Sequence, residues 1–321
     1  MRLLPGVRLV ERPGVLHFFD GRRVVSVRGD EQARRALRHV LGGGGASAVG
    51  GVVPAGAGGI SPDAADDARE LLARLNLALP ADSVPAPGAA PADDVDGRAL
   101  SVGAEFASAA TGGWVGPRLA HERLRDTVVH VWDDSGELCA ALAASGLRCA
   151  PLAGPGQVAA LDPAHSVVAV AAAPDRPLDR LRAANTACLR HGVSWLPVGG
   201  FDGARVHVGP LMIPGQSACA ECLLRRLAAN VEYGAVFAEV AAAPSAPTPH
   251  AVQAWSQSVA ALILLRWLAG RDAGLPGLLF TLVPDELALR QARVYRVPRC
   301  PSCAGPDFVT APAPWDIARD H

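Results

Sequence analysis

The chain has 321 residues, 50% of them hydrophobic and 19% charged, which is typical of a globular protein long enough for two cores. Its formal net charge of −1 predicts no overall attraction to nucleic acid or to a membrane surface. No apolar run reaches the roughly 20 residues of a membrane span, and the N-terminus lacks the apolar stretch of a signal peptide.

Three short runs near the N-terminus are predicted to be strands. They lie at residues 7–10, 15–19 and 24–28. Turn sequences separate them, because Pro13-Gly14 follows the first run and Asp20-Gly21 follows the second. The third strand is expected at an edge of the sheet.

Two helices are predicted after these strands. The first follows Asp30, a good N-cap, and ends at the glycines that begin with Gly42. The second covers residues 62–79, with Ser61 as its N-cap and Pro62 in its first position.

Three strands with helices packed on them indicate a winged-helix-like module over residues 1–80. A DNA-binding wing is one interpretation, although no helix here has a dense basic face. The other is a peptide-binding module, in which an extended peptide adds to the third strand and the neighbouring helix supplies pockets. The candidate peptide-binding residues are Val24, Val25, Ser26, Val27, Arg28, Leu71, Leu72 and Leu75. The apolar ones could equally be core residues.

A linker and a second domain follow. Residues 80–99 contain four prolines and read as an interdomain linker. The Gly- and Ala-rich stretch 100–116 either wraps a domain or reaches a partner. The predicted organisation is therefore a module at 1–80, a linking or wrapping segment at 81–118 and a second domain at 119–321.

Within the second domain, strands and helices alternate. Strands are predicted at 127–132, 167–171 and 194–198, and helices at 138–144 and 178–191. This alternation is typical of a doubly wound α/β fold with a parallel sheet.

A nucleotide-binding fold places a glycine-rich loop directly after the first strand, where backbone N–H groups approach phosphates. Here the chain reads Trp132-Asp133-Asp134-Ser135-Gly136-Glu137, and Gly136 alone matches that pattern. Two aspartates would repel phosphates, so ATP is not expected to bind. Asp133 and Asp134 are predicted to form a solvated loop.

Four cysteines form two C-x-x-C pairs, Cys219 with Cys222 and Cys300 with Cys303. Four thiolates around one ion make a closed, structural zinc site. Two unrelated redox or buried pairs are the alternative, which the loop-like sequence before Cys219 disfavours. The remaining cysteines, Cys139, Cys149 and Cys188, are predicted to be buried. This cysteine usage indicates the reducing cytoplasm.

The segment 174–200 resembles the ThiF-type (ubiquitin-activating-like) adenylyltransferase fold. Asp175, Arg180 or Arg182, Asn185 and Cys188 fall at the matching positions. Pro214-Gly215 before the first cysteine pair, a helix over 251–270 and the second pair extend the resemblance to about 120–303. It implies a ThiF-like Rossmann-type domain with a structural four-cysteine zinc site, in which Gly136, Asp175, Arg182 and Asn185 are vestiges of the nucleotide site.

Together with the N-terminal module, the chain resembles the leader-peptide-binding partner proteins of YcaO cyclodehydratases, which make azole-containing ribosomal peptides. That resemblance implies that the module, like a RiPP recognition element, binds a precursor leader. It also implies that ATP is used by a YcaO-type protein, expected here on a separate polypeptide because the chain ends soon after Cys303. ThiF-like domains commonly dimerise, so a homodimer is an option.

No catalytic residue is assigned. The nine histidines form no metal or catalytic motif, and residues 223–299 contain no cysteine for thioester chemistry. The leading hypothesis is a non-catalytic subunit that presents a precursor peptide to a cyclodehydratase. The alternatives are an ATP-dependent ThiF-type adenylyltransferase acting on a peptide or carrier protein, and a DNA-binding regulator.

Overall fold

The structure is a computed structural model. It describes residues 1–3, 8–19, 24–42, 60–75, 77–79, 97–173, 175–202, 204–230, 237–242 and 248–304. The predicted Asp20-Gly21 turn and the proline-rich linker up to residue 96 lie outside these ranges. We refer to residues 1–79 as the N-terminal module and to residues 97–304 as the main body.

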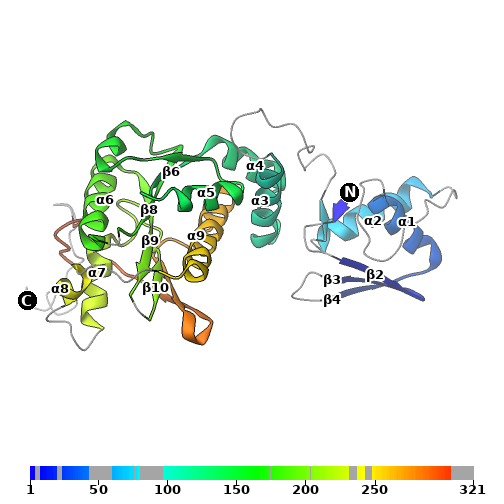
Figure 1. The fold of residues 1–321 in the computed structure, drawn as a ribbon. Helices are drawn as coiled ribbons and strands as arrows, with labels where there is room; N and C mark the ends of the chain where they lie inside the picture. The colour runs from blue at the N-terminus through cyan, green and yellow to red at the C-terminus, as the bar shows by residue number, and fades with distance from the viewer. Residues whose placement is uncertain are drawn as a thin grey trace, which may run out of the picture.

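The N-terminal module contains a three-stranded antiparallel sheet with two helices (Figure 1). The strands β2 (Arg8–Arg12), β3 (Val15–Phe19) and β4 (Val24–Arg28) lie in that order. A second, two-stranded sheet joins β1 (Arg2–Leu3) to β5 (Ala78–Leu79). Helices α1 (Glu31–Gly42) and α2 (Pro62–Arg74) complete the module. The three predicted strands are confirmed, and β1 and β5 were not predicted.

Both predicted helix starts in the module are confirmed by their caps. The N–H of Ala33 donates to the Asp30 carboxylate at 2.8 Å, and that of Ala64 donates to the Ser61 hydroxyl at 3.2 Å. The predicted end of the second helix at residue 79 is wrong. Helix α2 ends at Arg74, because the N–H of Leu77 bonds back to the carbonyl of Leu72 at 3.0 Å and closes the last turn.

The main body is built on a seven-stranded sheet of order β12-β11-β10-β9-β8-β6-β7. Its parallel part comprises β6 (Val128–Trp132), β7 (Cys149–Pro151), β8 (Ser166–Ala171) and β9 (Ser194–Phe201). Its antiparallel part comprises β10 (Val206–Val208), β11 (Leu278–Val283) and β12 (Ala288–Arg293). The predicted α/β alternation is confirmed, and the sheet is mixed rather than wholly parallel.

Helices cover both faces of this sheet (Figure 1). One core contains residues of α3 (Gly97–Ala110), α4 (Pro117–Asp126), α5 (Glu137–Ala144) and α9 (His250–Gly270). The other contains residues of α6 (Pro177–His191) and α7 (Ala220–Ala229), and α8 (Phe237–Ala242) lies beside α6. Two short 3-10 helices, η2 (Pro155–Ala160) and η4 (Pro284–Glu286), fill connections. Among the described helices, none has the combined length and apolar character needed to cross a membrane.

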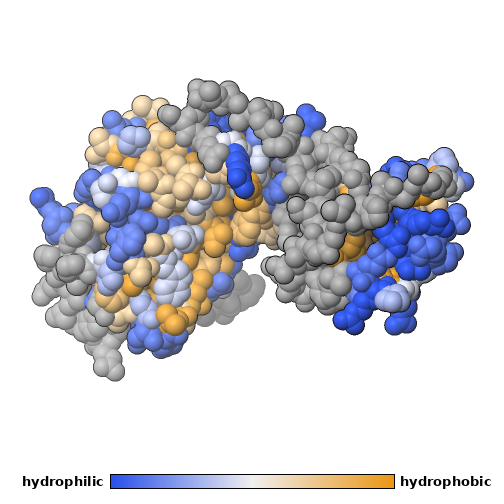
Figure 2. Space-filling view, turned by 45° about the vertical axis from the view of Figure 1, so that its right-hand side comes forward, coloured by the Kyte–Doolittle hydropathy of each residue, from blue (hydrophilic) through white to orange (hydrophobic). Residues whose placement is uncertain are grey.

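Helix α3 occupies most of the stretch expected to wrap a domain or reach a partner. Its small residues let it lie close to α9, since a Cβ added at Gly103 would come within 3.0 Å of the Leu265 side chain. Leu100, Ala104 and Ala107 are buried in the same core as α9. Figure 2 shows apolar residues gathered over part of the main body. On α3, the large apolar side chains of Val102 and Phe106 are exposed, as is that of Leu262 on α9.

Candidate functional site

The two C-x-x-C pairs converge on one point of the main body. Cys219 and Cys222 lie at the start of α7, and Cys300 and Cys303 lie in the segment after β12. Cys219 Sγ lies 3.8 Å from Cys222 Sγ and 3.7 Å from Cys300 Sγ. Cys222 Sγ lies 3.5 Å from Cys303 Sγ. All four sulfurs lie within 4.8 Å of one another. A tetrahedron of thiolates about 2.3 Å from a zinc ion has edges of about 3.8 Å, so the cluster fits such an ion.

The surroundings of the cluster favour a thiolate at Cys222 and hold the two halves of the cluster together. The N–H of Val297 donates to Cys222 Sγ at 3.3 Å. The pKa of the Cys222 thiol is lowered to about 4, chiefly by a hydrogen bond from Cys219 and further by that N–H. Arg296 donates to the carbonyls of Gly215 at 3.1 Å and Cys303 at 2.7 Å, which ties the two cysteine segments to each other. The four cysteines therefore form one cluster that can hold a metal ion, rather than two separate pairs.

The other cysteines lie outside this cluster. Cys188 is buried on α6, as predicted, and burial raises the pKa of its thiol to about 12. Cys139 and Cys149 are half-buried rather than buried, and burial raises the pKa of the Cys149 thiol to about 12. Burial also raises the pKa of the Cys139 thiol, and a thiol that stays protonated is a poor nucleophile.

In the loop after β6, the Asp133 carboxylate accepts hydrogen bonds from backbone N–H groups at the position where a nucleotide-binding fold has its phosphate-binding loop. Asp133 accepts hydrogen bonds from the Ser135 N–H at 3.1 Å, the Ser135 hydroxyl at 2.9 Å and the Leu138 N–H at 2.8 Å. These backbone groups at the start of α5 are the donors that a nucleotide fold offers to phosphate. Asp133 is thus a helix cap rather than part of a merely solvated loop, and Gly136 holds the left-handed conformation at the N-cap, with φ of 75°.

A cavity of about 270 Å³ opens beside this loop at the carboxyl ends of β6, β8 and β9. Arg180 crosses it, forming an ion pair with Asp134 and lying 5.1 Å over the Trp132 ring. The other lining residues include Ala171, Ala172, Val198, Gly199, Gly200, Thr248, Gln253, Ser256 and Gln257. Gln253 and Gln257, one turn apart on α9, were not predicted to line a site. The signal in the sequence was the presence of two polar residues at that spacing in an otherwise apolar helix.

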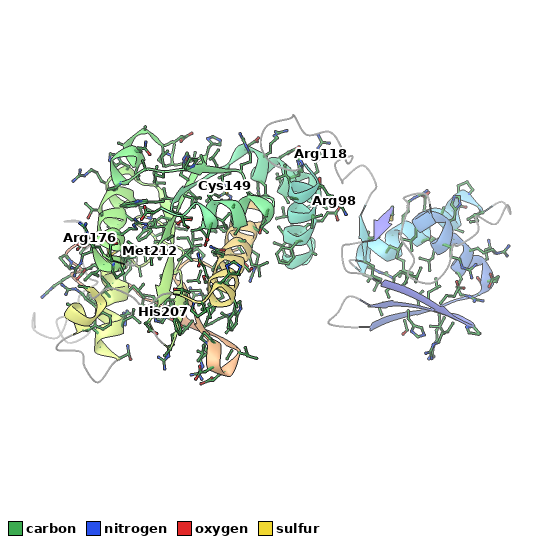
Figure 3. All side chains as sticks on the ribbon, in the orientation of Figure 1. Arg98, Arg118, Cys149, Arg176, His207 and Met212 are labelled. Carbon is green, nitrogen blue, oxygen red and sulfur yellow. The ribbon has the colours of Figure 1, made fainter. Side chains whose placement is uncertain are left out.

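The remaining predicted nucleotide-site positions lie elsewhere. Of the two arginines at the matching positions, Arg180 lines the cavity. Arg182 is exposed, and its Nε lies 3.9 Å from a carboxylate oxygen of Glu221. Asp175 is exposed beside Arg176, which Figure 3 shows at the outer side of the body near α6. Asn185 is only 3% exposed and accepts a hydrogen bond from the Ala220 N–H at 2.9 Å, next to Cys219.

The candidate peptide-binding strand β4 is the outer strand of its sheet. It pairs with β3 on one side, Val25 opposite Phe18 and Val27 opposite Leu16, and no described strand pairs with its other side. Val25 and Val27 pack partly against the module core, and Ser26 and Arg28 are exposed. The side chain of Val24 lies outside the described part.

The helical candidates divide between core and surface. Leu72 has an exposed fraction of 0%. It is therefore a core residue, which was the alternative to a peptide-binding role. Leu71 and Leu75 are half-buried at the edge of that core.

Comparisons with known proteins show a shared fold. No protein-family model matches the chain, and no curated protein matches it. A heterocyclase solved in complex with substrate and cofactor superposes with a TM-score of 0.65 at 19% identity, covering 96% of this chain and 39% of the heterocyclase. The heterocyclase TruD gives 0.61 at 18% identity, covering 94% and 42%. E. coli MccB with ATP gives 0.59 at 12% identity, covering 94% and 99%.

The chain is accordingly an α/β protein of the ThiF-like fold with a four-cysteine cluster. It spans about two fifths of the two heterocyclases, 39% and 42% of their lengths, and nearly the whole of MccB. Coverage of 96% of the chain requires that most of the N-terminal module is included in the superposition.

Proposed function

We propose that this chain binds the leader region of a ribosomally made precursor peptide and presents it to a separate, ATP-dependent YcaO-type cyclodehydratase that forms thiazoline or oxazoline rings. The observation that carries this proposal is that no described strand pairs with the outer side of β4, in a module that superposes with a heterocyclase solved in complex with substrate. The residues at 1–80 form the leader-binding domain and those at 119–321 form the ThiF-like domain. The segment 81–118 links the two and wraps the ThiF-like domain, with α3 packed in its core.

The leader binds as an added strand. The unpaired backbone groups of β4 supply hydrogen bonds whatever the peptide sequence, and side chains on the neighbouring surface supply selectivity. Val25, Val27, Leu71 and Leu75 offer the apolar contacts, and Ser26, whose hydroxyl lies 2.9 Å from His17 Nδ1, offers a polar one.

The main body acts as a scaffold rather than as an adenylating enzyme. The Asp133 carboxylate already uses the donors at the start of α5, so a phosphate there would meet a negative charge instead of free N–H groups. The four cysteines hold zinc as a structural ion, because four thiolates leave no position for water. Their cluster fixes α7 to the segment after β12.

Reconstitution tests the proposal. The purified chain, a YcaO-type cyclodehydratase and ATP are mixed with a Cys/Ser/Thr-rich precursor, and loss of water from the peptide is followed by mass spectrometry. We expect ring formation to require the chain and the leader together. Equal ring formation without the chain would contradict the proposal. Light scattering of the chain alone reports whether it forms a homodimer.

An adenylyltransferase is the second candidate, favoured by the cavity beside Arg180 and by the superposition with MccB over 99% of that protein. Isothermal titration with ATP and Mg²⁺ separates the two. The scaffold function predicts no binding at micromolar ATP. Tight, Mg²⁺-dependent binding would favour the enzyme.

A further inference from the structure

A second cavity, of about 680 Å³, opens on the main body between the end of α9 and the segment after β12. Three arginines line it, Arg271, Arg293 and Arg296, together with the aromatic rings of Trp267 and Tyr295. No aspartate or glutamate is among its lining residues, and it shares none of them with the cavity beside Arg180. The chemistry of this cavity is therefore cationic and aromatic.

The arginines are held in place without losing their charge. Arg293 donates to the carbonyls of Gly274 at 3.0 Å and Pro276 at 3.1 Å, and Arg271 lies 5.7 Å from the centre of the Trp267 ring. Neither forms an ion pair with a carboxylate in the described part of the chain. Carbonyls and rings orient a guanidinium, but they leave its positive charge available to a ligand.

The neighbouring helix end does not neutralise this charge. The C-terminus of α9 carries about half a unit of negative charge, against three guanidinium groups. Arg123 already donates to the carbonyl of Ala269 there, at 2.8 Å. The pKa of Arg271 is lowered by burial and further by the charge of Arg123, so two cations face each other at this point. An anion bound to Arg271 in the cavity would offset the repulsion between Arg271 and Arg123.

We propose that this cavity binds an acidic segment of polypeptide, with carboxylates on Arg271 and Arg293 and an apolar or aromatic side chain against Trp267 and Tyr295. Tyr295 is 62% exposed, and a large exposed ring favours a ligand with apolar side chains. Strand β12, which ends in Arg293 at the cavity wall, is the outermost strand of the seven-stranded sheet and offers backbone groups to an extended chain. The net charge of −1 disfavours a nucleic acid as the occupant.

This site is independent of leader binding on β4, because it lies on the main body and uses different residues. It provides a contact for an acidic polypeptide segment apart from the β4 edge. A failure of the leader proposal leaves it untouched, since its test requires neither the leader nor the cyclodehydratase.

The test is fluorescence anisotropy with the full chain at low salt. The probe is a fluorescein-labelled Glu-Phe-Glu-Phe-Glu-Phe peptide, and the reference is the same peptide with lysines in place of the glutamates. We expect the acidic peptide to bind at least about tenfold more tightly, a difference of about 1.4 kcal/mol, and to weaken as salt is raised.

Variants assign the binding to the cavity. Arg271→Gln should weaken binding at least about threefold and Arg271→Lys should restore part of it, whereas the double variant Arg271→Gln/Arg293→Gln should weaken it at least about tenfold. Arg290→Gln is the matched control, because Arg290 also lies on β12 but pairs with Glu286 outside the cavity. It should bind within about twofold of the parent.

Two outcomes overturn the proposal. One is equal affinity for the acidic and basic peptides, or for the parent and the Arg271→Gln variant. The other is displacement of the probe by inorganic pyrophosphate at lower concentration than by the unlabelled peptide, which would make this a phosphate site. Among the described residues the Arg271 guanidinium forms no hydrogen bond, so Arg271→Gln decides the matter even if the double variant folds poorly.

Discussion

The Asn185 side chain on α6 caps the neighbouring helix α7. Its oxygen accepts a hydrogen bond from the Ala220 N–H at 2.9 Å, and both groups are buried. The first N–H groups of a helix have no partner within the helix, and Cys219 at the N-cap supplies none from its side chain. Asn185 therefore positions the helix that carries the first cysteine pair.

Asn185→Ala should lower the free energy of unfolding by about 1 to 3 kcal/mol, because the Ala220 N–H would be left buried without an acceptor. Urea denaturation measures this. Asn230→Ala, at the exposed end of the same helix, is the control and should change stability by less than about 0.5 kcal/mol. Equal losses in the two variants would show that the cap is not what makes Asn185 important.

Gly146→Ala should destabilise the main body strongly. Gly146 has φ of 90°, and an added Cβ would collide with the backbone of Ala99 on α3. Gly136→Ala is a matched control, since Gly136 has φ of 75° but open space around it. Both variants carry a conformational penalty of about 1 kcal/mol, and the collision should add about 1 to 3 kcal/mol for Gly146→Ala alone. Thermal unfolding that ranks the two equally would contradict the packing of α3 against this turn.

The purified chain should contain about one zinc ion, and removing it with a chelator should lower Tm, because the free energy of metal binding is part of the folding free energy. Cys300→Ser should lose the metal. Cys139→Ser, half-buried on α5 outside the cluster, should retain it. Elemental analysis with thermal unfolding checks both, and a parent protein with little bound zinc would refute the assignment.

Proline in β4 should separate leader binding from folding. Along an antiparallel strand, N–H groups point alternately to the two sides, so one of Val25 and Ser26 bonds to β3 and the other faces outward. Val25→Pro and Ser26→Pro each remove one N–H. The variant that removes the outward N–H should bind a labelled leader at least about tenfold more weakly, about 1.4 kcal/mol, while the main body stays folded. Full binding by both variants would move the leader off this edge.

Elements with a strong local pattern could be predicted from the sequence. The strands β2 to β4 and the caps at Asp30 and Ser61 follow from alternation and from residues whose roles are local. Helix α3 could not be predicted in this way, because the stripe that it buries consists mainly of small residues, Gly103, Ala104, Ala107 and Ser108, which give a weak apolar signal. Its position is set by close packing on α9.

Side-chain roles in the candidate site needed the tertiary structure. Arg180 and Arg182 lie on opposite sides of α6, and the position of the sheet alone decides that Arg180 faces the cavity. Asn185 matched a nucleotide-site position by its place in the sequence, yet it faces α7. The four cysteines were predictable because the C-x-x-C spacing allows two thiolates to reach one ion, and two such pairs supply four ligands.

The separation of the cysteine pairs also sets an order of events during synthesis. Cys219 and Cys300 are 81 residues apart, as are Cys222 and Cys303. At about 5 to 20 residues per second, the ribosome needs roughly 4 to 16 s to pass from the first pair to the second. Throughout that interval the nascent chain presents two thiols with half a ligand set. Binding of a metal ion by all four cysteines would therefore wait until the segment after β12 has been made, whatever the metal supply during earlier elongation.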